Sequence, residues 1–311
     1  MKYLSAKVIK GKTYYYLQYR GYSKSLGTSL PENLKDHFIG FFIDVFDKEY
    51  LKLPFSVKKA FRFGDLKALE EQHYFYICLK SGLFAKSYSG HLLSFIILFT
   101  YHSNSQEGSD VTRKEVEDFA KSRIRKPKTK TDKEIKNSFD AFDYATSDEM
   151  RWNMKHIKKV HFLLLQEIDP LIAGQWKKEN NTAPGNQPTS DWKDVPKKMQ
   201  SLLSWLNTEL KKKNVYPPIL ALHFYSRFEA IHPFLDGNGR VGRILLNAIL
   251  HKFDYPFVIF FSENKTQHSD AIQQSLEGRW TKMYKHFLDQ VKKTEGELHS
   301  DLKTMLLKLK K

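Results

Sequence analysis

The chain has 311 residues, of which 41% are hydrophobic and 28% are charged, and its formal net charge is +16. This composition is that of a globular protein of about two domains, and it excludes a disordered chain and a collagen-like repeat. The single cysteine excludes an intrachain disulfide and a cysteine-rich zinc site, and it suits a reducing, cytoplasmic setting.

The positive charge favours polyanionic partners such as nucleic acid, nucleotides or acidic proteins, although surplus lysine also keeps a protein soluble. The longest strongly apolar run, residues 91–101, is too short to span a bilayer, so we expect no membrane association. The first residues, MKYLSAKVIKGK, lack the apolar core of a secretion signal. A cytoplasmic location is therefore expected.

Residues 1–29 are expected to form a small basic antiparallel β segment. Aromatic and β-branched runs at residues 6–9, 13–19 and 23–26 are separated by turns that contain glycine. The segment carries six basic residues and no acidic one. Its interleaved tyrosines and lysines predict nucleic-acid binding by stacking and phosphate contact. The alternatives are a meander packed on a helical domain and an oligomerisation arm that supports a homodimer.

Beyond this segment the apolar spacing becomes helical. Residues 30–84 are expected to form a helical N-terminal region, and residues 291–311 a basic, helical C-terminal tail. Thr112 and Glu115 have the spacing of a capping box that opens a helix. The predicted helices beyond residue 60 cover residues 65–82, 87–106, 113–123, 132–147, 150–168, 196–213, 217–231, 239–252 and 268–291. Residues 174–195 are polar and rich in Gly, Pro and Asn, and a loop of that length usually has a functional reason.

The informative motif is residues 232–243, HPFLDGNGRVGR. A helix ends at the proline, a tight glycine-rich turn follows, and a new helix begins near Gly239. Such a turn presents free backbone N–H groups at the positive end of a helix dipole, which is an anion site. Arg240 and Arg243 lie three residues apart on one face of the new helix, where a bound anion would offset their unfavourable position. Paired guanidinium groups suit phosphate oxygens.

Two further residues of the motif suggest chemistry on a bound phosphate. Asp236 would repel phosphate unless a divalent ion lies between them, and Mg²⁺ commonly binds through one carboxylate plus phosphates. His232 follows directly after a helix and would be placed to take a proton from an attacking hydroxyl. Each residue alone is more often structural, so the prediction depends on their occurring together.

These residues resemble the signature of the Fic family (filamentation induced by cyclic AMP), HPFx[DE]GNGRxxR, at every position of 232–243. Residues 223–231 are similar to the helix that precedes this motif in the family. Gly174, Gln175 and Trp176 resemble the start of its flap. In all, about 85–290 is Fic-like. The resemblance implies a mainly α fold, a Fic-type helical bundle with a short β-hairpin flap, to which the N-terminal β segment is added.

The resemblance implies transfer of AMP from ATP to a Ser, Thr or Tyr hydroxyl of a target protein or of the enzyme itself, with release of pyrophosphate. His232 would be the general base, and Asp236 would hold Mg²⁺ on the α- and β-phosphates. The remaining motif residues would bind the phosphates: Gly237, Asn238 and Gly239 as the anion cradle, Arg240 on the phosphates and Arg243 on the γ-phosphate. The flap near 174–195 would align the target by strand-like pairing.

Upstream, residues 103–108 read SNSQEG and fit the pattern [ST]xxxE[GN]. They resemble the inhibitory motif of Fic proteins that have an N-terminal inhibitory helix, here at about 92–108. Ser103 and Glu107 are four apart and share a helix face, and Gly108 suits a helix C-terminus. The core at 85–290 would therefore include its own brake.

The resemblance implies that Glu107 pairs with Arg243 and takes the place of the γ-phosphate, so that ATP binds misaligned for attack. Gln106 departs from the family pattern, in which an apolar residue is usual. The alternative is that Glu107 is a solvated carboxylate at a helix end.

The leading functional hypothesis is thus an autoinhibited protein adenylyltransferase. Within catalysis, the alternatives are removal of AMP, which the same glutamate supports in some relatives, and a transferase with another nucleotide donor. From a different class, the alternative is a DNA-binding regulator in which the nucleotide pocket senses rather than reacts. The presence of both His232 and Asp236 favours chemistry over sensing.

Overall fold

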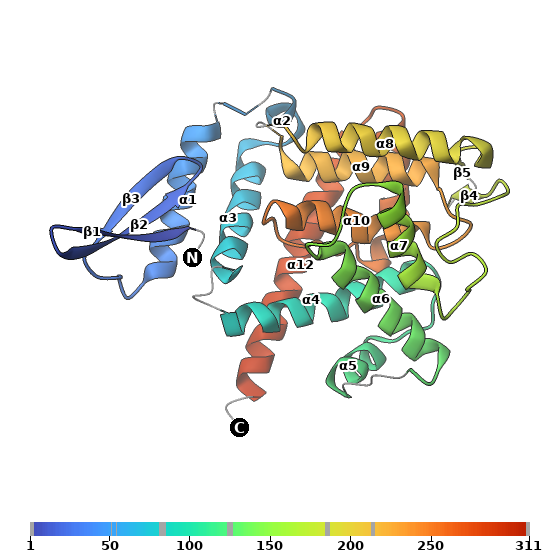
Figure 1. Cartoon of the computed structure of the whole chain (residues 1–311), viewed down its shortest axis with the longest axis horizontal. Helices are drawn as coiled ribbons and strands as arrows, with labels where there is room; N and C mark the ends of the chain where they lie inside the picture. Colours follow the sequence, from blue (N-terminus) through green and yellow to red (C-terminus); the bar gives the residue numbers. More distant parts are fainter. Residues whose placement is uncertain are drawn as a thin grey trace. The chain divides into compact units, whose positions relative to one another are not determined.

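A computed structural model of the chain describes residues 3–50, 52–53, 55–80, 85–122, 127–183, 187–212 and 215–308 (Figure 1). The fold is mainly α-helical with a small N-terminal sheet, as predicted. The chain divides into two compact units. The first comprises residues 1–92 with 254–256, and the second comprises residues 93–253 with 257–311.

The N-terminal segment forms a three-stranded antiparallel sheet in the order β1 (Leu4–Ile9), β2 (Lys12–Tyr19), β3 (Tyr22–Gly27). Two-residue turns, Lys10-Gly11 and Arg20-Gly21, join the strands. All four turn residues have positive φ, which is the geometry of type I′ turns and requires glycine at one position of each pair. The predicted meander is confirmed.

The sheet packs on α1 (Leu34–Tyr50), and α1 packs on α3 (Phe63–Lys80); the short helix α2 (Phe55–Ala60) lies between α1 and α3 in the chain. Tyr19 meets Phe42 edge-on, with ring centroids 4.9 Å apart. One of the tyrosines expected to stack on bases therefore packs against the core. Nucleic-acid binding by the rest of the sheet stays a prediction.

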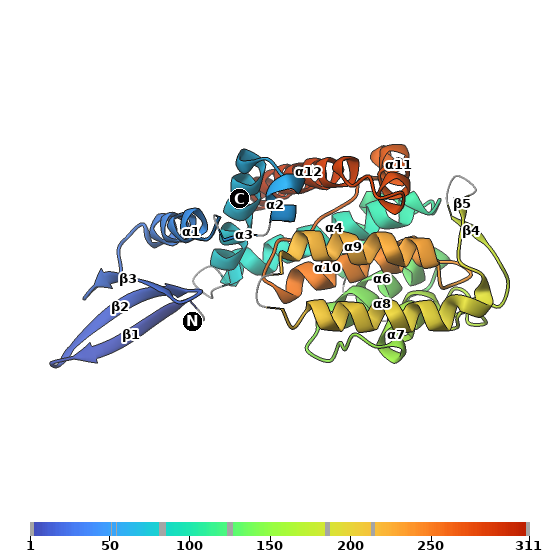
Figure 2. The same ribbon diagram turned by 90° about the horizontal axis from the view of Figure 1, so that it is seen from above.

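The second unit consists of helices, short 3₁₀ turns and a small hairpin. Its elements are α4 (Ala85–Gln106, which begins in the first unit), α5 (Arg113–Ser122), α6 (Lys130–Thr146), α7 (Met154–Leu165), β4 (Thr182–Ala183), β5 (Gln187–Pro188), η1 (Trp192–Asp194), α8 (Val195–Glu209), α9 (Pro217–Ile231), α10 (Asn238–Lys252), η2 (Ser262–Asn264), α11 (Lys265–Leu276) and α12 (Thr281–Lys308). Helix α9 packs against both α8 and α10 (Figure 2). β4 and β5 pair antiparallel as the expected hairpin.

The predicted helix over 268–291 is wrong, because the structure has two helices there. Gly278 has a φ of 83°, and the backbone N–H groups of Gly278 and Arg279 bond back to the carbonyls of Ser275 and Gln274. This is a glycine-terminated helix end. Helix α12 then continues past residue 291 to Lys308, so the expected tail boundary falls inside one helix.

The predicted capping box before α5 is confirmed. The backbone N–H of Glu115 donates to Thr112 Oγ1 at 3.3 Å, and the backbone N–H of Thr112 donates to a carboxylate oxygen of Glu115 at 2.8 Å. These bonds satisfy two donors that a helix start otherwise leaves free. Among the described residues, no helix has both the length and the apolarity needed to cross a membrane.

An extended segment, Phe257–Phe261, is buried in the second unit without joining a sheet. Its polar backbone groups are satisfied by side chains instead. Asn247 bonds both the N–H and the carbonyl of residue 258, Thr294 accepts the N–H of residue 259, and Gln290 accepts that of residue 261. Gln106, near the end of α4, donates to the carbonyl of residue 260. These bonds allow an irregular backbone in the core.

Candidate active site

The site begins where α9 ends. His232 is the C-cap residue, with φ 49° and ψ 62°, and its backbone N–H donates to the Phe228 carbonyl at 2.9 Å. This left-handed conformation reverses the chain at the histidine. A non-glycine residue pays a strain of about 1–2 kcal/mol for it, so the surrounding structure must enforce it.

The His232 ring is largely buried. Burial lowers its pKa to about 4, and the positive charge of Lys177 acts in the same direction. The ring is therefore neutral at physiological pH and able to accept a proton. Its Nδ1 atom is buried without a hydrogen-bond partner. A histidine that acts as a general base must be unprotonated and within reach of the proton, and His232 meets the first condition.

The turn after His232 is held rigid by Asn238. Its side chain accepts from the backbone N–H of Phe234 at 2.9 Å and donates to the carbonyl of the same residue at 2.8 Å. Gly237 has a φ of 76°, which lets the turn enter α10. The side chain expected to bind phosphate thus clasps the turn, while the N–H groups of the first turn of α10 have no partner within the helix.

His161, from α7, braces the same turn. It donates from Nε2 to the Asp236 carbonyl at 3.0 Å and accepts the Gly174 N–H on Nδ1 at 2.8 Å. Its ring stacks on Phe234 with centroids 3.7 Å apart. Burial lowers the pKa of His161 to about 4, so the ring stays neutral and can both donate and accept. His161 therefore lies between the motif and the start of the flap.

The N-terminus of α10 is occupied by a carboxylate. Glu107 lies against Gly239 so closely that a Cβ atom on that residue would collide with the carboxylate. Glu107 Oε1 also accepts from Arg243 Nη2 at 2.7 Å. Burial alone would raise the pKa of Glu107, but Arg243 outweighs that effect and the pKa is lowered. A negative group therefore already fills the predicted anion cradle.

Arg243 is 3% exposed and its guanidinium is held on several sides. Ser103 accepts from Nε through its hydroxyl at 3.1 Å and from Nη2 through its carbonyl at 2.8 Å. Gln106 accepts from Nη1 at 3.1 Å. The residue that departs from the family pattern is thus a further acceptor for the arginine. Gly108, with a φ of 84°, ends this segment just past α4.

The other two charged residues of the motif, the buried Arg240 and the exposed Asp236, pair with each other. Arg240 Nη2 lies 3.1 Å from Asp236 Oδ2, and the Asp236 side chain is 62% exposed. In the described parts of the chain, no group of three or more His, Cys, Asp or Glu side chains is arranged to hold a metal. A single exposed carboxylate beside an anion site fits a Mg²⁺ ion that shares its coordination with substrate phosphates.

The flap is fastened to the motif. Lys177, which is buried, donates its backbone N–H to the Pro233 carbonyl at 2.9 Å. Its Nζ donates to Asn181 Oδ1 and Thr189 Oγ1, each at 2.7 Å, across the base of the hairpin. Asn181 in turn donates to the Phe234 carbonyl at 2.9 Å. Lys177 and Asn181 therefore fasten the described part of the flap to the turn that follows His232.

These elements enclose a cavity of about 490 Å³, a size typical of small-molecule sites. Residues of the 232–243 motif, the residues at the end of α4, the flap and α11 all line it. The lining includes His232, Asp236, Gly239, Arg243, Glu107 and Lys265. All but Lys265 were singled out from the sequence.

Glu229 is a cavity residue that the sequence reasoning missed. Its carboxylate Oε2 lies 3.8 Å from His232 Nδ1, and its Oε1 is buried without a hydrogen-bond partner. Burial raises the pKa of Glu229 to about 8, so at neutral pH the group is mostly protonated. The available signal was its position three residues before His232, which places both on one helix face.

Comparisons with known proteins agree with this architecture. Residues 151–250 match the model of the Fic/DOC family. Proteins named protein adenylyltransferase Fic match over 199 residues, which are 62% of this chain: 27% identity for Drosophila grimshawi, covering 41% of that protein, and 26% for Drosophila willistoni, covering 40%. The chain thus spans about two fifths of the length of these curated relatives.

Solved structures show the same fold. A Fic domain-containing signaling protein from Bacteroides thetaiotaomicron has a TM-score of 0.65 at 23% identity, covering 77% of this chain and 97% of that one. Fic-1 from C. elegans has a TM-score of 0.56 at 18% identity, covering 88% and 92%. By its fold, this chain is similar to Fic proteins. Residues 151–250 are also similar in sequence to the Fic/DOC family.

Proposed function

We propose that this protein is an adenylyltransferase that transfers AMP from ATP to a Ser, Thr or Tyr hydroxyl of a protein, and that Glu107 restrains it. One observation carries the proposal. A carboxylate fills the anion cradle at Gly239 and Arg243, in the same cavity that holds a neutral His232. A cradle that accepts this carboxylate has the charge and the shape to accept a phosphate instead.

In the proposed reaction, the hydroxyl oxygen of the target attacks the α-phosphorus of ATP. His232 takes the hydroxyl proton, the bond between the α-phosphorus and the bridging oxygen breaks, and pyrophosphate leaves. The backbone N–H groups at the start of α10 and the guanidinium of Arg243 stabilise the phosphate charge. Catalysis is mostly positioning and charge stabilisation, as in related phosphoryl transfers.

Asp236 is the residue that would hold Mg²⁺. When bound, the ion would neutralise charge on the α- and β-phosphates. Release of Asp236 from Arg240 would accompany this, because the two side chains pair with each other in the structure. Arg240 would then be free to contact phosphate oxygens.

The restraint follows from competition for Arg243. The γ-phosphate and the Glu107 carboxylate need the same guanidinium donors and the same space beside Gly239. While the ion pair persists, ATP binds without its γ-phosphate in place, so its α-phosphate is not aligned with His232. The proposal includes autoinhibition on this ground.

Removal of AMP is the second candidate. The Glu107 side chain is 24% exposed and lines the same cavity as His232. A carboxylate in that position can orient a water molecule toward a phosphorus atom. In this reaction, water replaces the target hydroxyl as nucleophile and the released hydroxyl takes back a proton.

The test uses ATP labelled at either the α- or the γ-phosphate, with Mg²⁺ and a cell extract. We expect the labelling that the added protein causes to come from α-labelled ATP only, to be higher in Glu107→Gly and to be absent in the double variant with His232→Ala. A matched control, His156→Ala, changes a histidine that does not line the cavity. Labelling from γ-labelled ATP that requires the added protein and its His232 would indicate a kinase-like reaction and refute AMP transfer. Loss of label from pre-modified protein, dependent on Glu107, would identify the second candidate.

A further inference from the structure

A second cavity, of about 620 Å³, lies between α8 and α9. It is separate from the nucleotide site, although both are lined by Ala230. Its walls come from η1, α8, α9 and Ser190, which lies two residues after strand β5 of the flap hairpin. We call this cavity the α8–α9 groove, and its lining includes Ser190, Asp194, Lys197, Lys198, Trp205 and Arg227.

The α8–α9 groove is positively charged. Three of its side chains are cationic, those of Lys197, Lys198 and Arg227, against the single carboxylate of Asp194. Lys198 donates to Ser190 Oγ at 3.0 Å and lies 4.0 Å from the Asp194 carboxylate, so it is only loosely neutralised. Within the described ranges, no carboxylate pairs with Lys197 or Arg227. The groove is therefore suited to an anionic group from outside.

Arg227 is held in a form that suits carboxylates. Its guanidinium carbon lies 4.1 Å from the centre of the Trp205 ring, a stacked cation–π arrangement. Stacking covers one face of the guanidinium and leaves its edge, where the N–H donors lie, open to the groove. A planar fork that is already oriented binds a carboxylate in two-pronged fashion with little further loss of side-chain freedom.

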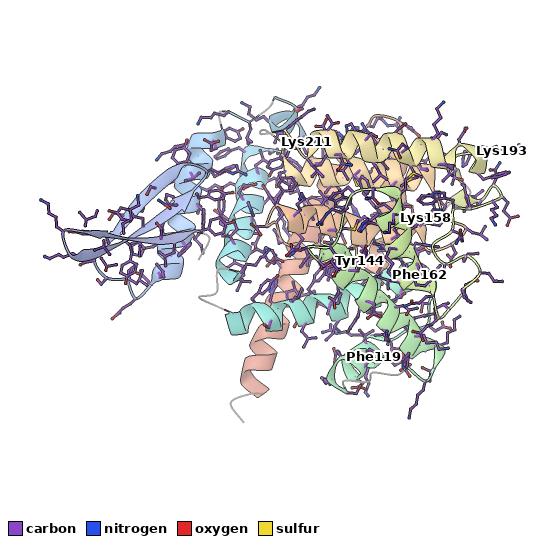
Figure 3. All side chains as sticks on the ribbon, in the orientation of Figure 1. Phe119, Tyr144, Lys158, Phe162, Lys193 and Lys211 are labelled. Atoms are coloured by element: carbon purple, nitrogen blue, oxygen red, sulfur yellow. The ribbon has the colours of Figure 1, made fainter. Side chains whose placement is uncertain are left out.

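The groove continues the path of a protein chain bound at the flap. Pro188, in strand β5, lines the nucleotide cavity, and Ser190, two residues later, lines the groove. Ala230, which both cavities share, precedes His232 by two residues. Lys193 and Lys211 mark the two ends of α8, and the hairpin lies at the Lys193 end (Figure 3). A segment paired with the flap at the catalytic histidine would therefore extend into the groove.

We propose that the α8–α9 groove docks an acidic segment of the target protein, next to the residue whose hydroxyl is modified. This inference rests on the proposed function and adds a substrate class to it. The charge of the groove selects carboxylates, and its continuity with the flap selects a peptide over a free anion. The groove thus determines which hydroxyls reach His232.

Peptide binding tests the groove without requiring catalysis. The probe is a fluorescein-labelled peptide with one serine flanked by four glutamates, titrated with the full-length chain in its inactive His232→Ala form. A matched peptide carries glutamines in place of the glutamates. We expect the acidic peptide to bind at least about tenfold more tightly at low salt, and the difference to shrink as salt screens the charges. Equal binding of both peptides would overturn the proposal.

Charge reversal locates the binding surface. The pair Lys197→Glu and Lys198→Glu should weaken acidic-peptide binding about tenfold or more, whereas Lys211→Glu with Lys212→Glu, the same charge change at the other end of α8, should change it less than about twofold. Equal losses in both pairs would refute the groove. Arg227→Gln provides a second, milder variant, expected to weaken binding with an unchanged melting temperature. Equally tight binding of single-stranded DNA that the same variants abolish would also refute a peptide-specific groove.

The two proposals fail in distinguishable ways. If no variant transfers AMP but acidic-peptide binding still depends on Lys197 and Lys198, the proposed function is wrong and the groove stands as an acidic-peptide site. If the Glu107→Gly form transfers AMP equally to acidic and neutral peptides, and the charge reversals leave both rates unchanged, the function stands and the groove is wrong.

Discussion

Under the proposed function, replacing Glu107 by glycine should raise the rate of AMP transfer and lower the stability of the fold at the same time. The substitution removes the carboxylate that bonds Arg243 at 2.7 Å. A hydrogen bond to a charged group contributes about 1.5–3 kcal/mol, so the wild-type protein must forgo about that amount before a γ-phosphate can reach the arginine. Since about 1.4 kcal/mol corresponds to a factor of ten, correctly aligned ATP should bind roughly 10- to 150-fold better in the variant.

The assay has two readouts. Self-modification with α-labelled ATP measures release, and thermal unfolding without nucleotide measures the cost to the fold. We expect a melting temperature roughly 3–12 °C lower in Glu107→Gly, because about 1.5–3 kcal/mol is lost from a unit of this size. Saturating ATP and Mg²⁺ should restore much of the loss, since a ligand at a hundred times its Kd adds about 2.7 kcal/mol.

Two further substitutions separate charge from shape. Glu107→Gln keeps the shape and one acceptor but removes the charge, and Glu107→Asp keeps the charge on a side chain too short to hold the same position. If charge competition is the brake, glutamine should release the enzyme partly and aspartate should retain some inhibition. Unchanged ATP affinity and unchanged self-modification in all three variants would refute the reasoning.

Gly239→Ala should lower the melting temperature by displacing Glu107 and yet fail to activate, because the new Cβ also fills the phosphate cradle; Gly296→Ala, which has open space, is the control, and an active, stable Gly239→Ala protein would contradict this. Glu229→Gln should stabilise the fold near neutral pH. In the folded protein Glu229 keeps its proton up to about pH 8, whereas in the unfolded chain it loses the proton near pH 4.5, so the free energy of unfolding of the wild type declines between these two pH values. In chemical denaturation, the difference between wild type and variant should vanish below pH 4.5. The acid limb of kcat/KM for ATP in the Glu107→Gly form should fall near pH 4 rather than 6.5, because burial lowers the pKa of His232; half-loss of activity near pH 6.5 would contradict a buried, neutral base.

The elements set by local chemistry were predictable. The two glycine-containing turns fixed the N-terminal sheet, and the capping box at Thr112 fixed the start of a helix. The break at Gly278 was equally local and was overlooked, because the apolar spacing continues on both sides of it. Segment 257–261 lay outside such reasoning, since its backbone partners come from α4, α10 and α12.

In the site, too, some residues could be predicted from the local sequence and others could not. Its motif residues were identified because they are contiguous and chemically unusual together. Lys177 was not, because one lysine among many has no local mark of a buried role; only the folded flap brings Asn181 and Thr189 to it. Gln106 was noticed as a departure from the family pattern, but its function depends on Arg243, which is 137 residues away in sequence.

Gln106 makes two hydrogen bonds with different parts of the fold, and this bears on how the proposed inhibition would be relieved. One end of its amide holds Arg243, and the other holds the Phe260 carbonyl in the interior. Pulling the whole end of α4 away would strand that carbonyl in a dry environment, at a cost of about 1–3 kcal/mol. Swinging the Glu107 side chain aside leaves the carbonyl satisfied. Activation should therefore proceed by a rotamer change at one carboxylate, on a faster timescale than the departure of a helix.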